Sequence, residues 1–174
     1  MFTELTLSII RAHSTRTKPP TGQRSQQKAP DLYVYITAVA KKGDSSDQGI
    51  EFFFAKTRVV KNNHKPVFNE SFAYARDPSV PYTLGTDNIF RVYLYDQAIG
   101  WGADESLGFF EIDLSQETAD HEERPAGASP PERAGFIDYH GFRSTVSYKV
   151  HLTINPTGSR IPGATVDDDF ELTS

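Results

Sequence analysis

Trp101 stands between two glycines in a stretch without a strand pattern, and Ile99 lies two residues before it. A tryptophan in such a place is difficult to bury in a core, and its amphipathic ring favours the headgroup layer of a bilayer. The polar residues 12–30 carry cations that contribute about 1 kcal/mol each near an anionic surface. These cations are Arg16, Lys18, Arg24 and Lys28. Together these residues predict contact with anionic lipid. In the alternative, Trp101 folds back onto a neighbouring loop and the cations are only solvated.

The histidines, carboxylates and glycines of the sequence show no arrangement that is typical of a catalytic site. The histidines are His13, His64, His121, His140 and His151. None of them stands in a nucleophile-elbow or metalloprotease frame, and the glycines do not form a phosphate-binding loop. Nothing in the sequence places carboxylates across a cleft. Cys is absent, which excludes a disulfide, a thiol nucleophile and a cysteine zinc site. We therefore expect no enzymatic activity.

Apolar and polar residues alternate along most of the chain, which indicates β-strands. Twelve Phe and eight Tyr, against one Met and one Trp, favour strands as well. We expect strands at residues 5–12, 32–38, 51–60, 68–75, 89–95, 107–114, 135–139 and 146–154. About eight strands with period-two patterning form two packed sheets. The expected fold is therefore all-β, an eight-stranded antiparallel Greek-key β-sandwich.

The length of 174 residues suits one domain with tails. We expect the sandwich domain over residues 1–155 and an acidic, disordered tail over residues 156–174, which are rich in Gly, Pro and Asp. A short helix, capped by Ser115, is expected over residues 115–123. No signal peptide or membrane span is visible. Together with the absence of Cys, this favours a cytoplasmic protein that associates reversibly with membranes.

The net charge of −5 is divided unevenly along the chain. Residues 1–70 contain eleven Lys/Arg and six Asp/Glu, a net +5, whereas residues 71–174 contain seven and seventeen, a net −10. An acidic protein is not a general nucleic-acid binder, so we expect no nucleic-acid partner. A local basic face stays compatible with these totals.

Five motifs occur in the order in which they stand in the C2 domain, a β-sandwich module that binds membranes, often through calcium. They are Asp31-Leu-Tyr-Val34, Lys56-Thr-Arg58, Pro66-Val-Phe-Asn-Glu70, Val92-Tyr-Leu-Tyr-Asp96 and Asp104-Glu-Ser-Leu-Gly108. The chain resembles this family over about residues 3–155, in the permuted topology of the phospholipases. The resemblance implies that residues 13–30, 61–66 and 97–106 gather at one pole of the sandwich.

The resemblance also implies a calcium site with a reduced set of acids. Asp31, Asp96 and Asp104 or Glu105 occupy positions that match the family's calcium ligands. Two further acids are missing, because residues 13–30 contain none and Ala98 stands at another ligand position. Calcium takes six to eight oxygens, so three carboxylates imply weak binding completed by backbone oxygens and water. In the alternative, these aspartates accept backbone N–H bonds in tight turns.

Lys56 and Arg58 form a second basic patch, at a place where some family members bind phosphoinositide headgroups. The spacing of two puts both side chains on one face of a strand, and paired cations suit a phosphate cluster. In the alternative, Lys56 and Arg58 are only solvated cations on an exposed face of the sheet and bind no headgroup.

These observations favour a peripheral membrane-binding module for anionic phospholipid, with weak or absent calcium dependence. A protein-interaction scaffold of the same fold without lipid binding is the alternative. Its surface would be the sheet face that carries Tyr33, Tyr35, Tyr93 and Tyr95. A regulatory piece of a larger lipid-acting enzyme is a third reading.

Overall fold

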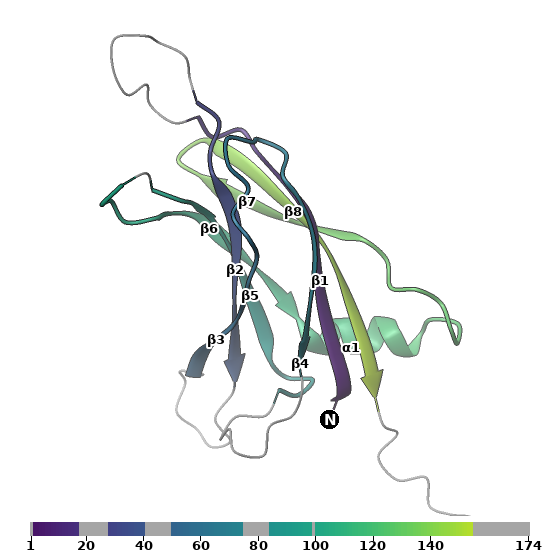
Figure 1. Cartoon of the computed structure of the whole chain (residues 1–174). Coiled ribbons are helices and arrows are strands. Elements are labelled where there is room, and N and C mark those ends of the chain that lie inside the picture. The colour runs from purple at the N-terminus through teal and green to yellow at the C-terminus, as the bar shows by residue number, and fades with distance from the viewer. Residues whose placement is uncertain (1, 18–27, 41–49, 75–83, 99, 155–174) are drawn as a thin grey trace, which may run out of the picture.

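The computed structural model describes residues 2–17, 28–40, 50–74, 84–98 and 100–154. Within these ranges the chain forms eight strands and one helix (Figure 1). The elements are β1 (Phe2–Ser14), β2 (Leu32–Ala40), β3 (Ile50–Lys56), β4 (Val67–Tyr74), β5 (Ile89–Asp96), β6 (Glu105–Asp113), α1 (Leu114–Glu122), β7 (Arg133–Tyr139) and β8 (Phe142–Ile154). The predicted order of elements is thus confirmed. The expected tail, residues 156–174, lies outside the described residues.

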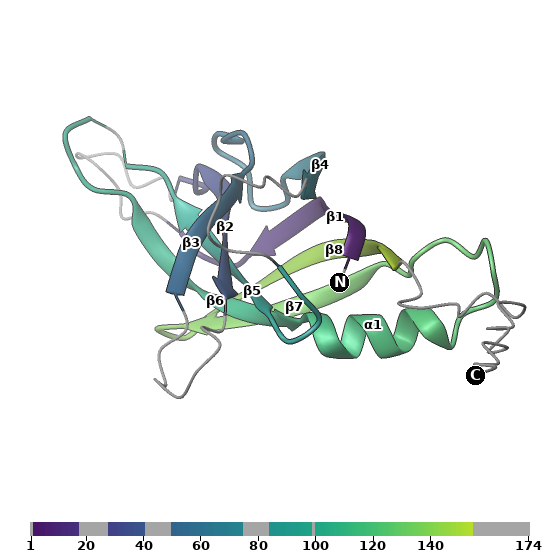
Figure 2. The ribbon, with the colours of Figure 1, turned by 90° about the horizontal axis from the view of Figure 1, so that it is seen from below.

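The strands form two four-stranded antiparallel sheets, in the orders β4-β1-β8-β7 and β3-β2-β5-β6. The last strand, β8, lies between β1 and β7, which is the expected permuted arrangement. Figure 2 shows the two sheets as separate layers, with α1 beside β7 and β8. The all-β sandwich predicted from the alternating pattern is confirmed.

The core lies between the sheets because alternate residues of each strand point inward. Leu5, Leu7 and Ile9 of β1 are fully buried, and they face Val34 and Ile36 of β2 within the same hydrophobic cluster. The strand β7 comes close to β6 through a glycine. A Cβ added at Gly135 would lie 2.3 Å from the ring of Phe110, so only glycine permits this approach.

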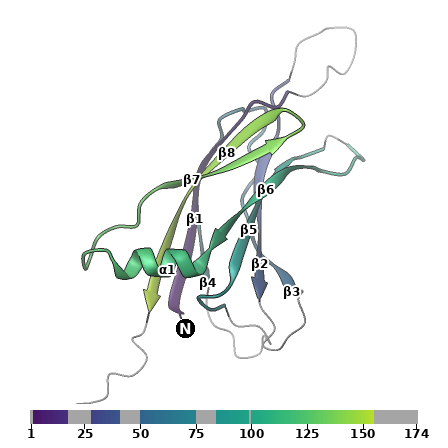
Figure 3. The same cartoon turned by 180° about the vertical axis from the view of Figure 1, so that it is seen from behind.

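Four connections meet at one end of the sandwich, which we call the loop pole (Figures 1 and 3). Its described residues are 13–17, 28–31, 57–66, 97–98, 100–104 and 140–141. Backbone hydrogen bonds join these segments: Ser14 N–H donates to the His64 carbonyl at 2.9 Å, Asn63 N–H to Pro30 at 3.0 Å, Gln97 N–H to Asp31 at 2.8 Å and Thr15 N–H to Arg143 at 3.0 Å. The predicted meeting of residues 13–30, 61–66 and 97–106 is thus observed for their described parts.

Two local predictions are wrong. The helix begins one residue early, and its N-cap is Asp113, whose side chain accepts the Ser115 N–H at 2.8 Å. An ionised carboxylate is a strong N-cap and also favours the positive end of the helix. The third strand ends at Lys56 instead of continuing to Val60, which keeps only an isolated bridge to Leu32.

Within the described residues, no helix combines the length and apolarity required to cross a bilayer.

Candidate functional site

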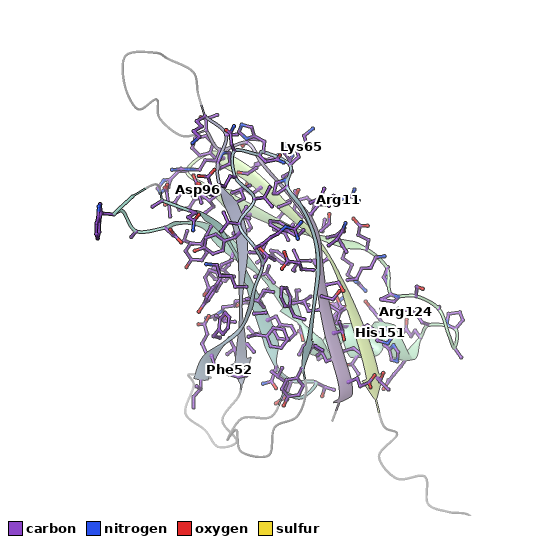
Figure 4. The ribbon with its side chains drawn as sticks, in the orientation of Figure 1. Arg11, Phe52, Lys65, Asp96, Arg124 and His151 are labelled. Carbon is purple, nitrogen blue, oxygen red and sulfur yellow. The ribbon has the colours of Figure 1, made fainter. Side chains whose placement is uncertain are left out.

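Asp31 and Asp96 lie at the centre of the loop pole, and both are buried. The Asp31 N–H donates to Asp96 Oδ1 at 2.9 Å, and the Asn62 N–H donates to Asp31 Oδ1 at 2.6 Å. Asn62 has a positive φ of 51°, which places its N–H in a tight turn of the β3–β4 loop. The two carboxylates therefore fix three loops by accepting backbone N–H bonds. Figure 4 labels Asp96 and Lys65 at this pole.

Arg16 lies among the carboxylates of the pole instead of in a solvated loop. Its side chain is 14% exposed, its Nη2 donates to Glu105 Oε2, and its Nε is 4.0 Å from Asp96 Oδ2. The guanidinium carbon is also 5.5 Å from the centroid of the Phe142 ring. A planar guanidinium suits such a place, because it can bind a carboxylate and lie on an aromatic face together. Arg16 thus places one positive charge beside two acids predicted as calcium ligands.

Asp104 closes the base of the β5–β6 loop. Its Oδ1 accepts the Ala98 N–H at 3.0 Å, and its Oδ2 accepts the hydroxyl of Tyr33 at 2.6 Å. Burial, followed by this bond to Asp104, raises the pKa of Tyr33 well above its ordinary value. The Tyr33 hydroxyl therefore stays protonated, and its hydrogen bond holds the Asp104 carboxylate against the end of β2.

Lys56 and Arg58 do not share a strand face, because β3 ends at Lys56 and strict alternation no longer applies at Arg58. Lys56 Nζ lies 4.0 Å from the centroid of the Tyr33 ring in β2. The Arg58 guanidinium instead reaches β4 of the other sheet, where it binds Glu70 at 3.0 Å and the carbonyls of Val67 and Phe68, each at 2.8 Å. The two cations thus bind different sheets, although both remain partly accessible to solvent.

The tip of the β5–β6 loop exposes an indole. Trp101 has a relative exposure of 108%, so its side chain packs against nothing in the described chain. The loop that carries it projects beyond the sheets (Figure 1). Lys28, Lys61 and Lys65 are exposed at the same pole. Trp101 therefore does not fold back onto any neighbouring loop that the structure describes. Ile99, Lys18 and Arg24 lie outside the described residues.

The acids of the pole do not form a ready calcium shell. Calcium requires six to eight oxygens, but Asp31, Asp96 and Asp104 accept backbone or tyrosine hydrogen bonds and Glu105 binds Arg16. Among the described residues, no group of three or more His, Asp or Glu side chains could hold a metal ion. In this arrangement the residues do not fit the ion, and their role as its ligands stays a prediction.

The sandwich, its strand order and the loop pole define a class of eight-stranded β-modules whose connecting loops gather at one end. A comparison with family models then identifies it: the C2 domain model matches residues 3–128, so this chain belongs to the C2 domain family. C2 domains are generally non-catalytic modules that bind phospholipids or proteins, and many bind calcium. No curated protein matches this chain.

Several solved structures share the fold. The chain is similar to human GIVD cytosolic phospholipase A2, with 17% identity and a TM-score of 0.52 over 86% of this chain and 16% of that chain. It is also similar to the two-domain structure of Extended-Synaptotagmin 2, with 16% identity and a TM-score of 0.54 over 87% of this chain and 42% of that chain. A single C2 domain of plant Extended Synaptotagmin 1 gives 19% identity and a TM-score of 0.50, over 88% of this chain and 98% of that chain. The chain therefore spans only about a sixth of the phospholipase, and identities this low show the fold alone.

Proposed function

We propose that this C2 domain docks on anionic phospholipid membranes through its loop pole, with weak or absent dependence on calcium. The observation that carries the proposal is the fully exposed Trp101 at the tip of the β5–β6 loop. An indole in water at a loop tip is costly, whereas the headgroup layer favours it. Exposed lysines at the same pole add attraction to an anionic surface.

The contributions are small enough to make docking reversible. Burying Trp101 contributes roughly 2–3 kcal/mol, and Lys28, Lys61 and Lys65 contribute about 1 kcal/mol each near an anionic surface. Arg16 is left out of this sum, because its charge is already used within the protein. The gross total of about 5–6 kcal/mol corresponds to a dissociation constant of roughly 0.1 mM. A second anchor or several copies on one membrane would strengthen it through avidity.

Arg16 also supports the weak calcium dependence. A calcium ion at such a pole would neutralise carboxylates and attract anionic lipid. Here the guanidinium already places a positive charge beside Asp96 and Glu105, so calcium would have to displace it. Isothermal titration with millimolar calcium should give no heat, and measurable heat would contradict this part of the proposal.

The test is sedimentation with vesicles of phosphatidylcholine alone or mixed with phosphatidylserine, in calcium or in chelator. Binding should require phosphatidylserine, persist in chelator and fall with added salt. Trp101→Ala should weaken binding about ten-fold or more, since 1.4 kcal/mol corresponds to a factor of ten. The control is Phe53→Ala, whose ring is 56% exposed on β3 and which pairs with Thr37, away from the loop pole. No binding in any condition would favour a protein-interaction scaffold instead.

The same sedimentation assay with phosphoinositide vesicles tests the headgroup contact that the sequence predicts at Lys56 and Arg58. Lys56→Ala should weaken binding to phosphoinositide vesicles more than to phosphatidylserine vesicles of equal charge. Lys56 is the better probe because Arg58 also anchors β4, so its removal would change the fold locally. Equal losses on both vesicles would argue against a headgroup site.

A further inference from the structure

Six aromatic rings form a continuous surface on the outer side of the sheet β3-β2-β5-β6, which we call the aromatic plate. Its residues are Tyr33, Tyr35, Phe53, Tyr93, Tyr95 and Phe109. A row of rings crosses all four strands, from Phe53 to Tyr35 with centroids 5.2 Å apart, to Tyr93 at 6.4 Å and to Phe109 at 5.0 Å. Tyr33 and Tyr95 are stacked beside this row at 5.3 Å. Figure 3 shows the four strands that carry the plate.

The plate is apolar and accessible at both edges of the sheet. Phe53 on β3 is 56% exposed and Phe109 on β6 is 46% exposed. The α1 helix lies beside β7 and β8 (Figure 2) and binds Arg133 of β7, so it does not cover the plate. Large exposed rings joined in one patch are typical of an interaction surface, and Tyr, with Trp and Arg, is enriched at binding hot spots.

The charges around the plate are acidic on balance. Arg91 binds Glu51 at 2.8 Å and Glu111 at 2.9 Å, and Asp104 and Lys56 lie beside Tyr33. These five groups are two cations and three carboxylates, a net −1. A hydrogen bond from Thr37, with others from Tyr93 and Arg91, lowers the pKa of Glu51 and keeps it ionised. Among the described residues, Arg91 is held between two carboxylates, and Lys56 lies on the Tyr33 ring where β3 ends and the loop pole begins.

The rings themselves accept cations in this geometry. Lys56 Nζ lies 4.0 Å from the Tyr33 centroid, and the Arg91 guanidinium carbon lies 5.5 Å from the Phe109 centroid. A ring face attracts a guanidinium most strongly where water is excluded. Tyr33 is itself buried, so a guanidinium from a partner would lie on the half-buried rings of Tyr35 and Tyr93, beside the surplus negative charge.

We propose that the aromatic plate docks a polypeptide segment of a partner protein that carries arginine beside apolar side chains. The apolar side chains lie on the exposed rings of Phe53 and Phe109, and the arginines lie on tyrosine faces near Glu51 and Glu111. An anionic membrane is a poorer occupant, because the charges described around the plate are acidic on balance and Arg91 is paired with two carboxylates. Phe53 and Phe109 lie within β3 and β6, outside the residues of the loop pole, so changing them separates this interaction from the proposed lipid docking.

The experiment uses the full chain labelled with ¹⁵N and a fluorescent hexapeptide, Arg-Leu-Arg-Leu-Arg-Gly, with a matched peptide in which glutamate replaces arginine. The arginine peptide should bind and shift the amide signals of β2, β3, β5 and β6 around the plate, whereas the glutamate peptide should not. Phe53→Ser combined with Phe109→Ser should raise the dissociation constant at least ten-fold. Phe136→Ser, which removes an even more exposed ring from the other sheet, should leave it within two-fold of the original value.

Two further measurements complete the test: the effect of a charge change on peptide binding, and the effect of the double variant on vesicle binding. Glu111→Gln should weaken the arginine peptide a few-fold, because it removes negative charge from the rim. The double serine variant should keep the ¹⁵N spectrum of a folded protein and bind phosphatidylserine vesicles as the original chain does. Equal binding of both peptides, signal shifts confined to the loop pole, or loss of vesicle binding by the double variant would overturn the proposal.

Discussion

Arg16 shows how one side chain can change the chemistry of a loop cluster. In the sequence it is one of four cations in an acid-free stretch, and nothing distinguishes it from Lys18, Arg24 or Lys28. The register of β1 against β8 places Ser14 opposite Ser144, and Arg16 follows two residues later beside the acids of the pole. Only the three-dimensional pairing separates Arg16, which binds Glu105, from Lys28, which is exposed.

The variant Arg16→Gln tests this role. It removes the positive charge of Arg16 beside Asp96 and Glu105, so the free energy of unfolding should fall by about 2 kcal/mol, less than for a fully buried pair because Glu105 is 40% exposed. Calcium should then raise the melting temperature of the variant but not of the original chain. The control is Arg11→Gln, whose ion pair with Glu132 is exposed and whose loss should cost under about 1 kcal/mol. Equal destabilisation by both changes would refute the role.

At the scale of elements, α1 is fixed to the sandwich by an ion-pair cluster. Arg133 of β7 lies 3.2 Å from Glu117 and also binds Asp120, and both acids belong to the helix. Glu117 is buried, and this burial raises its pKa, while the charge of Arg133 acts in the opposite direction. The neighbouring charges of Asp120 and Arg124 act on it as well. Keeping Glu117 ionised therefore lowers stability near neutral pH.

The pH dependence of Glu117→Gln follows from that direction. The folded protein holds the Glu117 proton more tightly than the unfolded chain, so this group adds stability as pH falls from above its raised pKa towards its ordinary value near 4.5. The variant lacks this gain. The difference in unfolding free energy, variant minus original, should thus decrease as pH is lowered from 7.5 to 4.5. Urea titrations measure it, with Glu122→Gln on the exposed side of α1 as control. A flat difference would show that burial does not govern this carboxylate.

For the whole molecule, period-two patterning was sufficient to predict eight strands and two sheets, because each buried face must be apolar on alternate residues. The family motifs then predicted the common pole. The predicted N-cap of α1 was wrong because Asp113 and Ser115 are both good capping residues, and only the backbone conformation decides between them. The predicted end of β3 was wrong because Val59 and Val60 continue the apolar strand pattern, whereas the chain already leaves its regular pairing with β2 after Lys56. The continuous plate was missed, although its tyrosines were noted, because Phe53 and Phe109 join it only across four strands.

Docking through the loop pole fixes the orientation of the whole sandwich on a membrane. The chain contains no Cys, so single cysteines can be labelled cleanly with a polarity-sensitive dye. Ala103→Cys lies in the β5–β6 loop beside Trp101, whereas Asp87→Cys precedes β5 at the opposite end and Glu122→Cys lies on α1; all three positions are exposed. With phosphatidylserine vesicles, the dye at residue 103 should shift to the blue and those at residues 87 and 122 should stay unchanged. Similar shifts at all three positions would mean that the sandwich lies flat on the surface, and would rule out docking by the pole.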